Sequence, residues 1–337
     1  MKNLITDVSG LRVGNAQDDD LKSGTTAVLC DVPNVASVHV MGGAPGTRDT
    51  DLLQPENTVQ SVDGFVLSGG SAFGLDAAGG AQSWLRSQGK GFQVGDQRVP
   101  IVPAAILFDL INGGKKDWGL HAPYRELGYQ AAQNAADDFS LGSVGAGTGA
   151  LTGGPLPGLK GGLGSASAKT ASGYTVGALV AVNALGSPVI GDTKHFWASA
   201  FEQNAEFGDA GLPDPGVSDL AKLNIKFRQQ PRPQSNTTIG IVATDAPLTK
   251  GEVKRLTIAA HDGFARAIWP SHLPLDGDLI FGVSTGLAER PVELEDQIDL
   301  SATAASTMSR AIARGVFEAR EAPNDLFPSW AKRFTAD

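Results

Sequence analysis

Glycines gathered in short clusters constrain this chain more than any other feature of its sequence. The chain has 43 glycines among 337 residues, nearly twice the average share of about 7%. They follow no G-X-Y period and the hydrophobic content is 41%, so neither collagen nor disorder fits. Because glycine lacks a Cβ atom, clusters of it permit tight turns and close backbone approach. We therefore expect a compact fold with crowded backbone around a site, built on clusters at Gly42-Gly43, Gly69-Gly70, Gly79-Gly80, Gly113-Gly114, 145–149, 153–154 and 161–164.

Apolar strand patterns and amphipathic helix patterns are interspersed along the chain, which predicts a layered α/β domain. No internal repeat is visible. Thr249 is an expected helix N-cap, and residues 202–235 read as a proline-rich exposed linker. The patterns predict strands over 25–40, 62–67, 99–110, 175–190 with a turn at Asn183–Pro188, the stretch after Thr238, and 279–285; they predict helices over 72–87, 124–138, 251–268 and 299–319.

The charge and cysteine content exclude several classes of partner. The formal net charge is −9, which argues against nucleic acid and anionic membranes as partners. No run of 18 apolar residues occurs, and the first 15 residues lack a signal-peptide core. A lone Cys30 fits a reducing compartment, so we expect a cytoplasmic protein. The five histidines are scattered without metal-ligand spacing, and we expect neither a metal nor another cofactor.

Residues 234–245, QSNTTIGIVATD, place two adjacent threonines directly before a β-branched apolar run. A threonine hydroxyl is a poor nucleophile unless a base activates it. A threonine at a chain N-terminus can use its own α-amine, whose pKa of about 8 suits neutral pH better than that of a lysine. An internal threonine gains such an amine when its hydroxyl attacks the preceding carbonyl and cuts the chain. An exposed linker before a rigid strand suits this reaction, although the dipeptide alone fits an ordinary strand edge better.

Other motifs have plain structural interpretations beside their functional ones. The glycine run at 142–149 lacks the ending of a phosphate-binding P-loop, and Ser68 and Ser71 do not match a G-x-S-x-G nucleophile elbow. Arg48 fits a structural pairing with Asp49 or Asp51, with a role in binding a substrate carboxylate as the alternative.

Eight motifs occur in one order and together resemble the DmpA-type family of self-cleaving aminopeptidases, also called L-aminopeptidase/D-esterase, which includes the nylon-oligomer hydrolases. The resemblance covers roughly residues 5–320. It implies a four-layer α/β/β/α sandwich like that of N-terminal-nucleophile hydrolases, a single domain over 1–337 cut into segments 1–236 and 237–337, and a homotetramer. The motifs are GGAPGTRDTDLL (42–53), SGGSAFGLDAAGG (68–80), VPIVPAAILFDL (99–110), GSVGAGTG (142–149), KGGLGSAS (160–167), VGALVAVNALG (176–186), NTTIGIVATDAPLTK (236–250) and DGDLIFGVST (276–285).

The resemblance also implies a set of site residues. Thr237, directly after Asn236, matches the nucleophile of self-cleavage, and Asn183 matches an asparagine that binds the developing oxyanion. Asp276 and Asp278 match a pair of positions that face the nucleophile. Two residues apart on a strand, they would point to the same face. Lys160 matches a basic residue near the site.

Two positions depart from the family pattern. Many members carry a lysine after the GAGTG run, where this chain has Gly154, and either Lys160 or Lys169 could take its place. Some members carry a tyrosine where this chain has Phe108, which removes a phenolic hydroxyl from the expected oxyanion site.

The expected function is that of a self-cleaving N-terminal-threonine amide hydrolase acting on short peptides or amino-acid oligomers, ω-amino-acid oligomers included. Two alternatives remain open from the sequence. One is acyl transfer like that of ornithine acetyltransferases, which use a self-cleaving threonine on a similar fold. The other is an uncleaved relative that binds a small amine without turnover.

Overall fold

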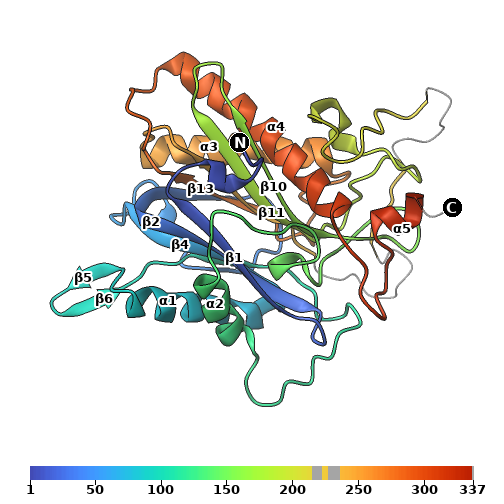
Figure 1. The fold of residues 1–337 in the computed structure, drawn as a ribbon, viewed down its shortest axis with the longest axis horizontal. Coiled ribbons are helices and arrows are strands. Elements are labelled where there is room, and N and C mark those ends of the chain that lie inside the picture. The colour runs from blue at the N-terminus through green and yellow to red at the C-terminus, as the bar shows by residue number, and fades with distance from the viewer. Residues whose placement is uncertain (215–221, 227–235, 336–337) are drawn as a thin grey trace.

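The computed structural model describes residues 1–214, 222–226 and 236–335, and Figure 1 shows their arrangement. The strands are β1 (Leu11–Asp18), β2 (Ser23–Val40), β3 (Thr47–Arg48), β4 (Ser61–Ser68), β5 (Phe92–Val94), β6 (Gln97–Val99), β7 (Ala104–Ile106), β8 (Leu151–Thr152), β9 (Leu159–Lys160), β10 (Gly162–Lys169), β11 (Thr175–Val182), β12 (Ile239–Thr244) and β13 (Leu279–Ser284). The α-helices are α1 (Ala77–Ser87), α2 (Tyr124–Gln133), α3 (Lys250–Ala267), α4 (Leu294–Phe317) and α5 (Trp330–Thr335).

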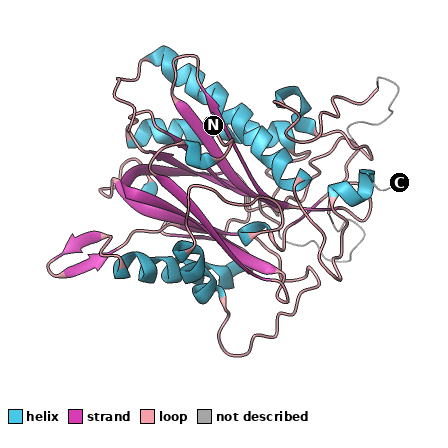
Figure 2. Ribbon diagram, viewed as in Figure 1, coloured by secondary structure: helices cyan, strands magenta, loops and turns pink. Residues whose placement is uncertain are grey.

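The long strand β2 joins the two halves of the main sheet. Its first part pairs with β1 and β4, and its last part pairs with β13. The sheet order is β10-β11-β12-β13-β2-β4-β7-β3, with β1 added beside β2. Helices α3 and α4 cover one half, and α1 and α2 lie on the opposite side of the molecule against the other half (Figures 1 and 2). The structure is the four-layer α/β/β/α sandwich that the resemblance implied.

Three apolar cores separate these four layers. The central core lies between the sheet halves and takes Ile239 and Ile241 from β12 together with Phe65 from β4. Successive residues of a strand face opposite sides, so Val242 of β12 packs into the second core, under α3 and α4. The third core joins α1 and α2 to the other half of the sheet. Strand β12 is thus covered on both faces, which explains why it is buried along its whole length and carries almost only apolar residues.

Several predicted elements are confirmed, and α3 is confirmed with its cap. The Thr249 hydroxyl accepts a hydrogen bond from the Glu252 N–H at 3.4 Å, and the Glu252 carboxylate accepts the Thr249 N–H at 2.8 Å. Such a reciprocal capping box contributes roughly 1 kcal/mol to helix stability. The strands predicted over 25–40, 62–67 and 279–285 are also present.

Other boundaries were wrong for identifiable reasons. The strand predicted over 99–110 is reduced to Ala104–Ile106 because Pro100 and Pro103 offer no N–H to a neighbouring strand. The helix predicted from residue 72 begins as a 3-10 turn over Ser71–Asp76 and becomes α-helical at Ala77. The helix expected over 124–138 ends at Gln133, the closing helix begins at Leu294, and the strand from 175 ends at Val182. Strands β1 and β10 and the short strands β3, β5, β6, β8 and β9 were not predicted.

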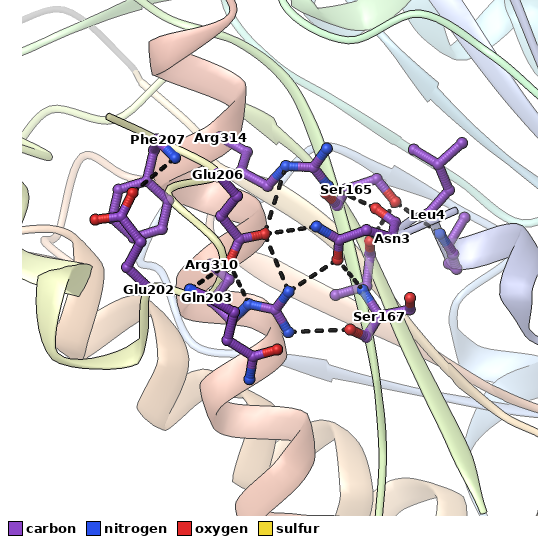
Figure 3. Close-up of polar contacts among 12 residues, drawn as sticks. Asn3, Leu4, Ser165, Ser167, Glu202, Gln203, Glu206, Phe207, Arg310 and Arg314 are labelled. Carbon is purple, nitrogen blue, oxygen red and sulfur yellow. Dashed lines mark hydrogen bonds and ion pairs between the residues drawn. The ribbon is translucent and has the colours of Figure 1, made fainter. Parts of the chain in front are cut away.

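The predicted linker over 202–235 lies only partly within the described residues. Its first turn is fixed to α4, because the Glu206 carboxylate accepts hydrogen bonds from Arg310 at 2.5 and 3.0 Å and from the Asn3 amide at 2.6 Å (Figure 3). Arg314, one turn further along α4, makes an ion pair with the same carboxylate at 3.6 Å. This network holds the N-terminal residues and the beginning of the linker on one helix. Within the described part of the chain, no helix is both long and apolar enough to cross a membrane.

Candidate active site

Three strand ends bring the predicted site residues together. Strands β11 and β12 are antiparallel with Ala181 opposite Ile239, so the residue after β11, Asn183, faces Thr237 just before β12. Strands β12 and β13 are parallel with Ile239 opposite Leu279. A parallel β-bridge also joins Asn236 to Asp276. Asp276 and Asp278 therefore lie in the segment before β13 that runs beside Asn236 and Thr237.

The Asn236–Thr237 peptide is buried and held on both sides. The Thr237 N–H donates to the backbone carbonyl of Asn183 at 3.1 Å. The Asn236 carbonyl oxygen accepts the Gly277 N–H at 2.8 Å, and it also accepts the Thr237 hydroxyl at 2.5 Å. Thr237 is only 1% exposed. The hydroxyl therefore lies against the carbonyl that it would attack, and a backbone N–H already polarises that carbonyl.

Asp276 and Asp278 lie beside this peptide and face different partners. The Asp276 carboxylate accepts the N–H groups of Leu185 at 3.2 Å and Leu273 at 3.1 Å. The Asp278 carboxylate accepts the Thr238 N–H at 2.8 Å. Burial, with a further contribution from Asp278, raises the pKa of Asp276 to about 7. Both aspartates position the backbone around Thr237, and their hydrogen bonds go to groups other than the Thr237 side chain.

His272 was not identified by the sequence analysis, yet it contacts this site directly. Its Nδ1 lies 2.9 Å from an oxygen of Asp278, and its backbone N–H donates to the same oxygen at 3.1 Å. The ring also stacks edge-on against His261 at 4.9 Å between centroids, and His261 against His39 at 5.1 Å. The histidines are scattered in sequence, and only the tertiary fold brings these three together. No cluster of metal-binding side chains exists among the described residues.

The side chain of Asn183 lies in a polar pocket. Its Oδ1 accepts the Leu151 N–H at 3.0 Å, and its Nδ2 donates to the backbone carbonyl of Phe108 at 3.1 Å. Phe108, the position of the missing tyrosine, thus contributes its carbonyl group. A primary amide has a second N–H, which an oxyanion could accept.

The lysine beside Asn183 is Lys226, which was not among the residues predicted from the sequence. Its ammonium group donates to Asn183 Oδ1 at 3.0 Å and to the Leu151 carbonyl at 2.5 Å. The sequence carries only a weak signal, a lysine between two apolar residues within a segment interpreted as linker. Lys160 instead pairs with Asp325 at 2.8 Å, and Lys169 lies exposed at the end of β10.

The remaining candidates have structural roles. The Arg48 guanidinium lies 3.6 Å from the Asp49 carboxylate and donates to the Gln82 side chain at 2.9 Å. Ser68 ends β4, where its hydroxyl is hydrogen-bonded to that of Thr25 at 2.9 Å. In the run 142–149, a Cβ atom on Gly147 would lie 2.1 Å from the Leu163 backbone nitrogen, so this glycine serves close backbone packing.

Comparison with known proteins identifies the family of this chain. The model of peptidase family S58 matches residues 3–325. The chain belongs to this family. It is 41% identical over 349 aligned residues to a protein named an uncharacterized aminopeptidase from Mycobacterium tuberculosis (strain ATCC 25618 / H37Rv), covering 97% of this chain and 98% of the relative. It is 25% identical to a 6-aminohexanoate-oligomer endohydrolase from Kocuria sp. (strain KY2), covering 92% of this chain and 79% of the relative.

Solved structures of similar fold agree with the architecture. A Burkholderia sp. beta-aminopeptidase matches with a TM-score of 0.68 at 21% identity, over 99% of this chain and 92% of that structure. The L-aminopeptidase D-Ala-esterase/amidase from Ochrobactrum anthropi, described as a variant of the Ntn hydrolase fold, also gives 0.68 at 21% identity, over 97% of this chain and 89% of that structure. The fold class is confirmed, and family and relatives together show a hydrolase of peptide or amide bonds, an aminopeptidase or amidase.

Proposed function

We propose that this S58 hydrolase cuts its own chain between Asn236 and Thr237 and then uses Thr237 as an N-terminal nucleophile on amide substrates. The observation that carries the proposal is the buried Thr237 hydroxyl, 2.5 Å from the oxygen of the preceding carbonyl, which the Gly277 N–H also binds. Pairing of β12 with its neighbours does not require both the Thr237 hydroxyl and the Gly277 N–H to bind the Asn236 carbonyl oxygen.

Self-cleavage would proceed in two steps, an acyl shift to an ester and hydrolysis of that ester. The Thr237 oxygen bonds to the Asn236 carbonyl carbon, its proton passes to the Thr237 nitrogen, and the C–N bond breaks to leave an ester. Water then hydrolyses the ester, giving a carboxylate at Asn236, a free amine at Thr237 and the restored hydroxyl. The Gly277 N–H stabilises the negative oxygen in each tetrahedral intermediate, and removing one such donor typically costs a few kcal/mol.

The same groups would serve substrate hydrolysis after cleavage. The Thr237 amine takes the proton from its own hydroxyl as the oxygen attacks the substrate carbonyl. We propose the second N–H of the Asn183 amide, beside that of Gly277, as the other donor to the oxyanion. The amine then protonates the leaving nitrogen, an acyl-threonine forms, and water releases the acyl group. Asp276 and Asp278 hold the two strand ends that align these groups.

The proposed substrates are short peptides or amino-acid oligomers. Aminopeptidase names among the relatives and an oligomer endohydrolase support this class, with ω-amino-acid oligomers included. The peptidase family and the aminopeptidase and endohydrolase names of the relatives favour hydrolysis over an acyl transfer like that of ornithine acetyltransferases.

An intact-mass spectrum of the purified, denatured protein tests self-cleavage. We expect two species in place of the 34.8 kDa chain, the smaller one beginning at Thr237 and holding about three tenths of the mass. Hydrolysis of amino-acid amides and 6-aminohexanoate oligomers would then accompany the cleaved form. A single uncut species without turnover would contradict the proposal and favour the alternative of a binding protein.

We also propose a homotetramer of cleaved units in the cytoplasm. The assembly rests on the family resemblance, and the compartment rests on the single, buried and unpaired Cys30. Light scattering on the purified protein should give about four times the chain mass. A monomeric mass would contradict the tetramer and leave the proposed chemistry intact.

A further inference from the structure

Lys226 reaches the site on a short, well-anchored piece of chain. Its backbone N–H donates to the Leu185 carbonyl at 2.8 Å, and the Asn224 side chain donates to the Gly191 carbonyl at 3.0 Å. Lys226 is 3% exposed. A lysine is rarely buried so completely, because removing its charge from water is costly without compensating partners. The complete burial of Lys226 therefore suggests that its side chain has a specific role.

Close backbone packing makes the approach of Lys226 possible. A Cβ atom on Gly153 would lie 2.4 Å from the Asn224 carbonyl oxygen, nearer than real side chains come. The glycine thus lets the segment of Lys226 lie against the chain beside Leu151. The Lys226 ammonium then meets the Leu151 carbonyl and both oxygens of Asn183.

These contacts determine how the Asn183 side chain is oriented. Oδ1 accepts two donors, the Leu151 N–H and the Lys226 ammonium, each at 3.0 Å. Turning the amide over would place its NH₂ group against both donors, so Oδ1 stays on the lysine side and Nδ2 on the other. The ammonium also lies 3.4 Å from the Asn183 backbone oxygen, which accepts the Thr237 N–H. Lys226 therefore contacts both groups of Asn183 that bear on the reaction.

We infer that Lys226 is a positioning residue for self-cleavage, acting through Asn183 to hold the Thr237 nitrogen and the oxyanion-binding amide in place. The inference rests on the proposed function. Lys226 lies in the predicted linker, and it stays on the 1–236 segment after cleavage. The inference thus gives a residue of the linker a role in the reaction.

The charge on Lys226 is set by its surroundings. Burial lowers the pKa of Lys226 to about 7, opposed by the carboxylates of Asp276 and Asp109. As pH rises through about 7, the group loses its charge and one of its three N–H donors. Cleavage in the native protein should therefore slow as the pH rises through this range. Asp276 ionises over the same range, so its ionisation also contributes to the pH profile.

The test compares Lys226→Met with Lys222→Met, because Lys222 lies in the same segment but pairs at the surface with Asp192 at 2.7 Å. Unprocessed protein is followed over time by intact mass from pH 6 to 9. We expect Lys226→Met to slow the appearance of the Thr237 N-terminus by roughly ten- to a hundredfold and to lose the decline above pH 7. Lys222→Met should follow the native time course.

A double-mutant cycle with Asn183→Ala separates positioning from general destabilisation. Asn183→Ala removes the side-chain amide and keeps the backbone carbonyl, so Lys226→Met should slow cleavage several-fold less in the Asn183→Ala background than in the native chain. Equal losses in both backgrounds, or an unchanged rate in Lys226→Met, would overturn the inference while the native protein still cleaves. Native protein that never cleaves would overturn it together with the proposed function. If the Met variant fails to fold by circular dichroism, Lys226→Gln takes its place in the cycle, because the Gln amide still donates a hydrogen bond.

Discussion

Thr237→Ala is expected to remain a single 34.8 kDa chain and to show no amide hydrolysis. The substitution removes the only atom that can attack the Asn236 carbonyl in the proposed reaction, and the Thr237 amine cannot form. Loss of a nucleophile typically lowers the rate by about 10⁴-fold or more. Intact mass after prolonged incubation measures the first effect, and release of amine from an amino-acid amide measures the second.

Thr238→Ala is the matched control for this experiment. Thr238 is equally buried and next in the chain, but its hydroxyl has no hydrogen-bond partner in the described structure. Its backbone N–H, which binds Asp278, is kept in the alanine variant. Thr238→Ala should therefore cleave at nearly the native rate, and Thr237→Ser should retain cleavage because it keeps a hydroxyl. Cleavage in Thr237→Ala would assign the nucleophile to another residue.

The sequence alone predicted the part of the site that lies at the ends of regular strands. Thr237 and Asp278 each stand just before a buried, mostly apolar strand, so their places at strand ends follow from the local pattern. The motif order then indicated Asn183 as their neighbour. Pairing of β11 with β12 and of β12 with β13 brings all three together.

The residues that were missed come from irregular chain. Lys226 lies in a segment without periodicity, and its burial depends on the absence of a side chain at Gly153, more than 70 positions earlier. His272 follows α3 and meets Asp278 through a turn. No local pattern specifies such contacts, because they arise only after distant segments have packed. Lys160, predicted from its motif, is instead bonded to Asp325 near the C-terminus.

Gly277 shows how closely the backbone must approach at the cleavage site. A Cβ atom at this position would lie 2.6 Å from the Ala44 carbonyl oxygen and 2.7 Å from the Thr237 hydroxyl. Neither neighbour can move freely, since Ala44 also donates its N–H to the Asp276 carbonyl at 2.8 Å. A larger residue must therefore displace either the nucleophile or the strand whose N–H holds the scissile carbonyl.

Gly277→Ala should consequently slow self-cleavage by about a hundredfold, the loss expected when reacting groups shift by about 1 Å. The unfolding free energy should fall by roughly 1–3 kcal/mol from overpacking. Gly251→Ala is the control, because a Cβ atom there, in the first turn of α3, meets nothing within 4 Å. Intact mass over time gives the rates, and urea titration gives the stabilities. If Gly277→Ala lost stability but cleaved as fast as Gly251→Ala, the close approach of the backbone at Gly277 would not control the rate of cleavage.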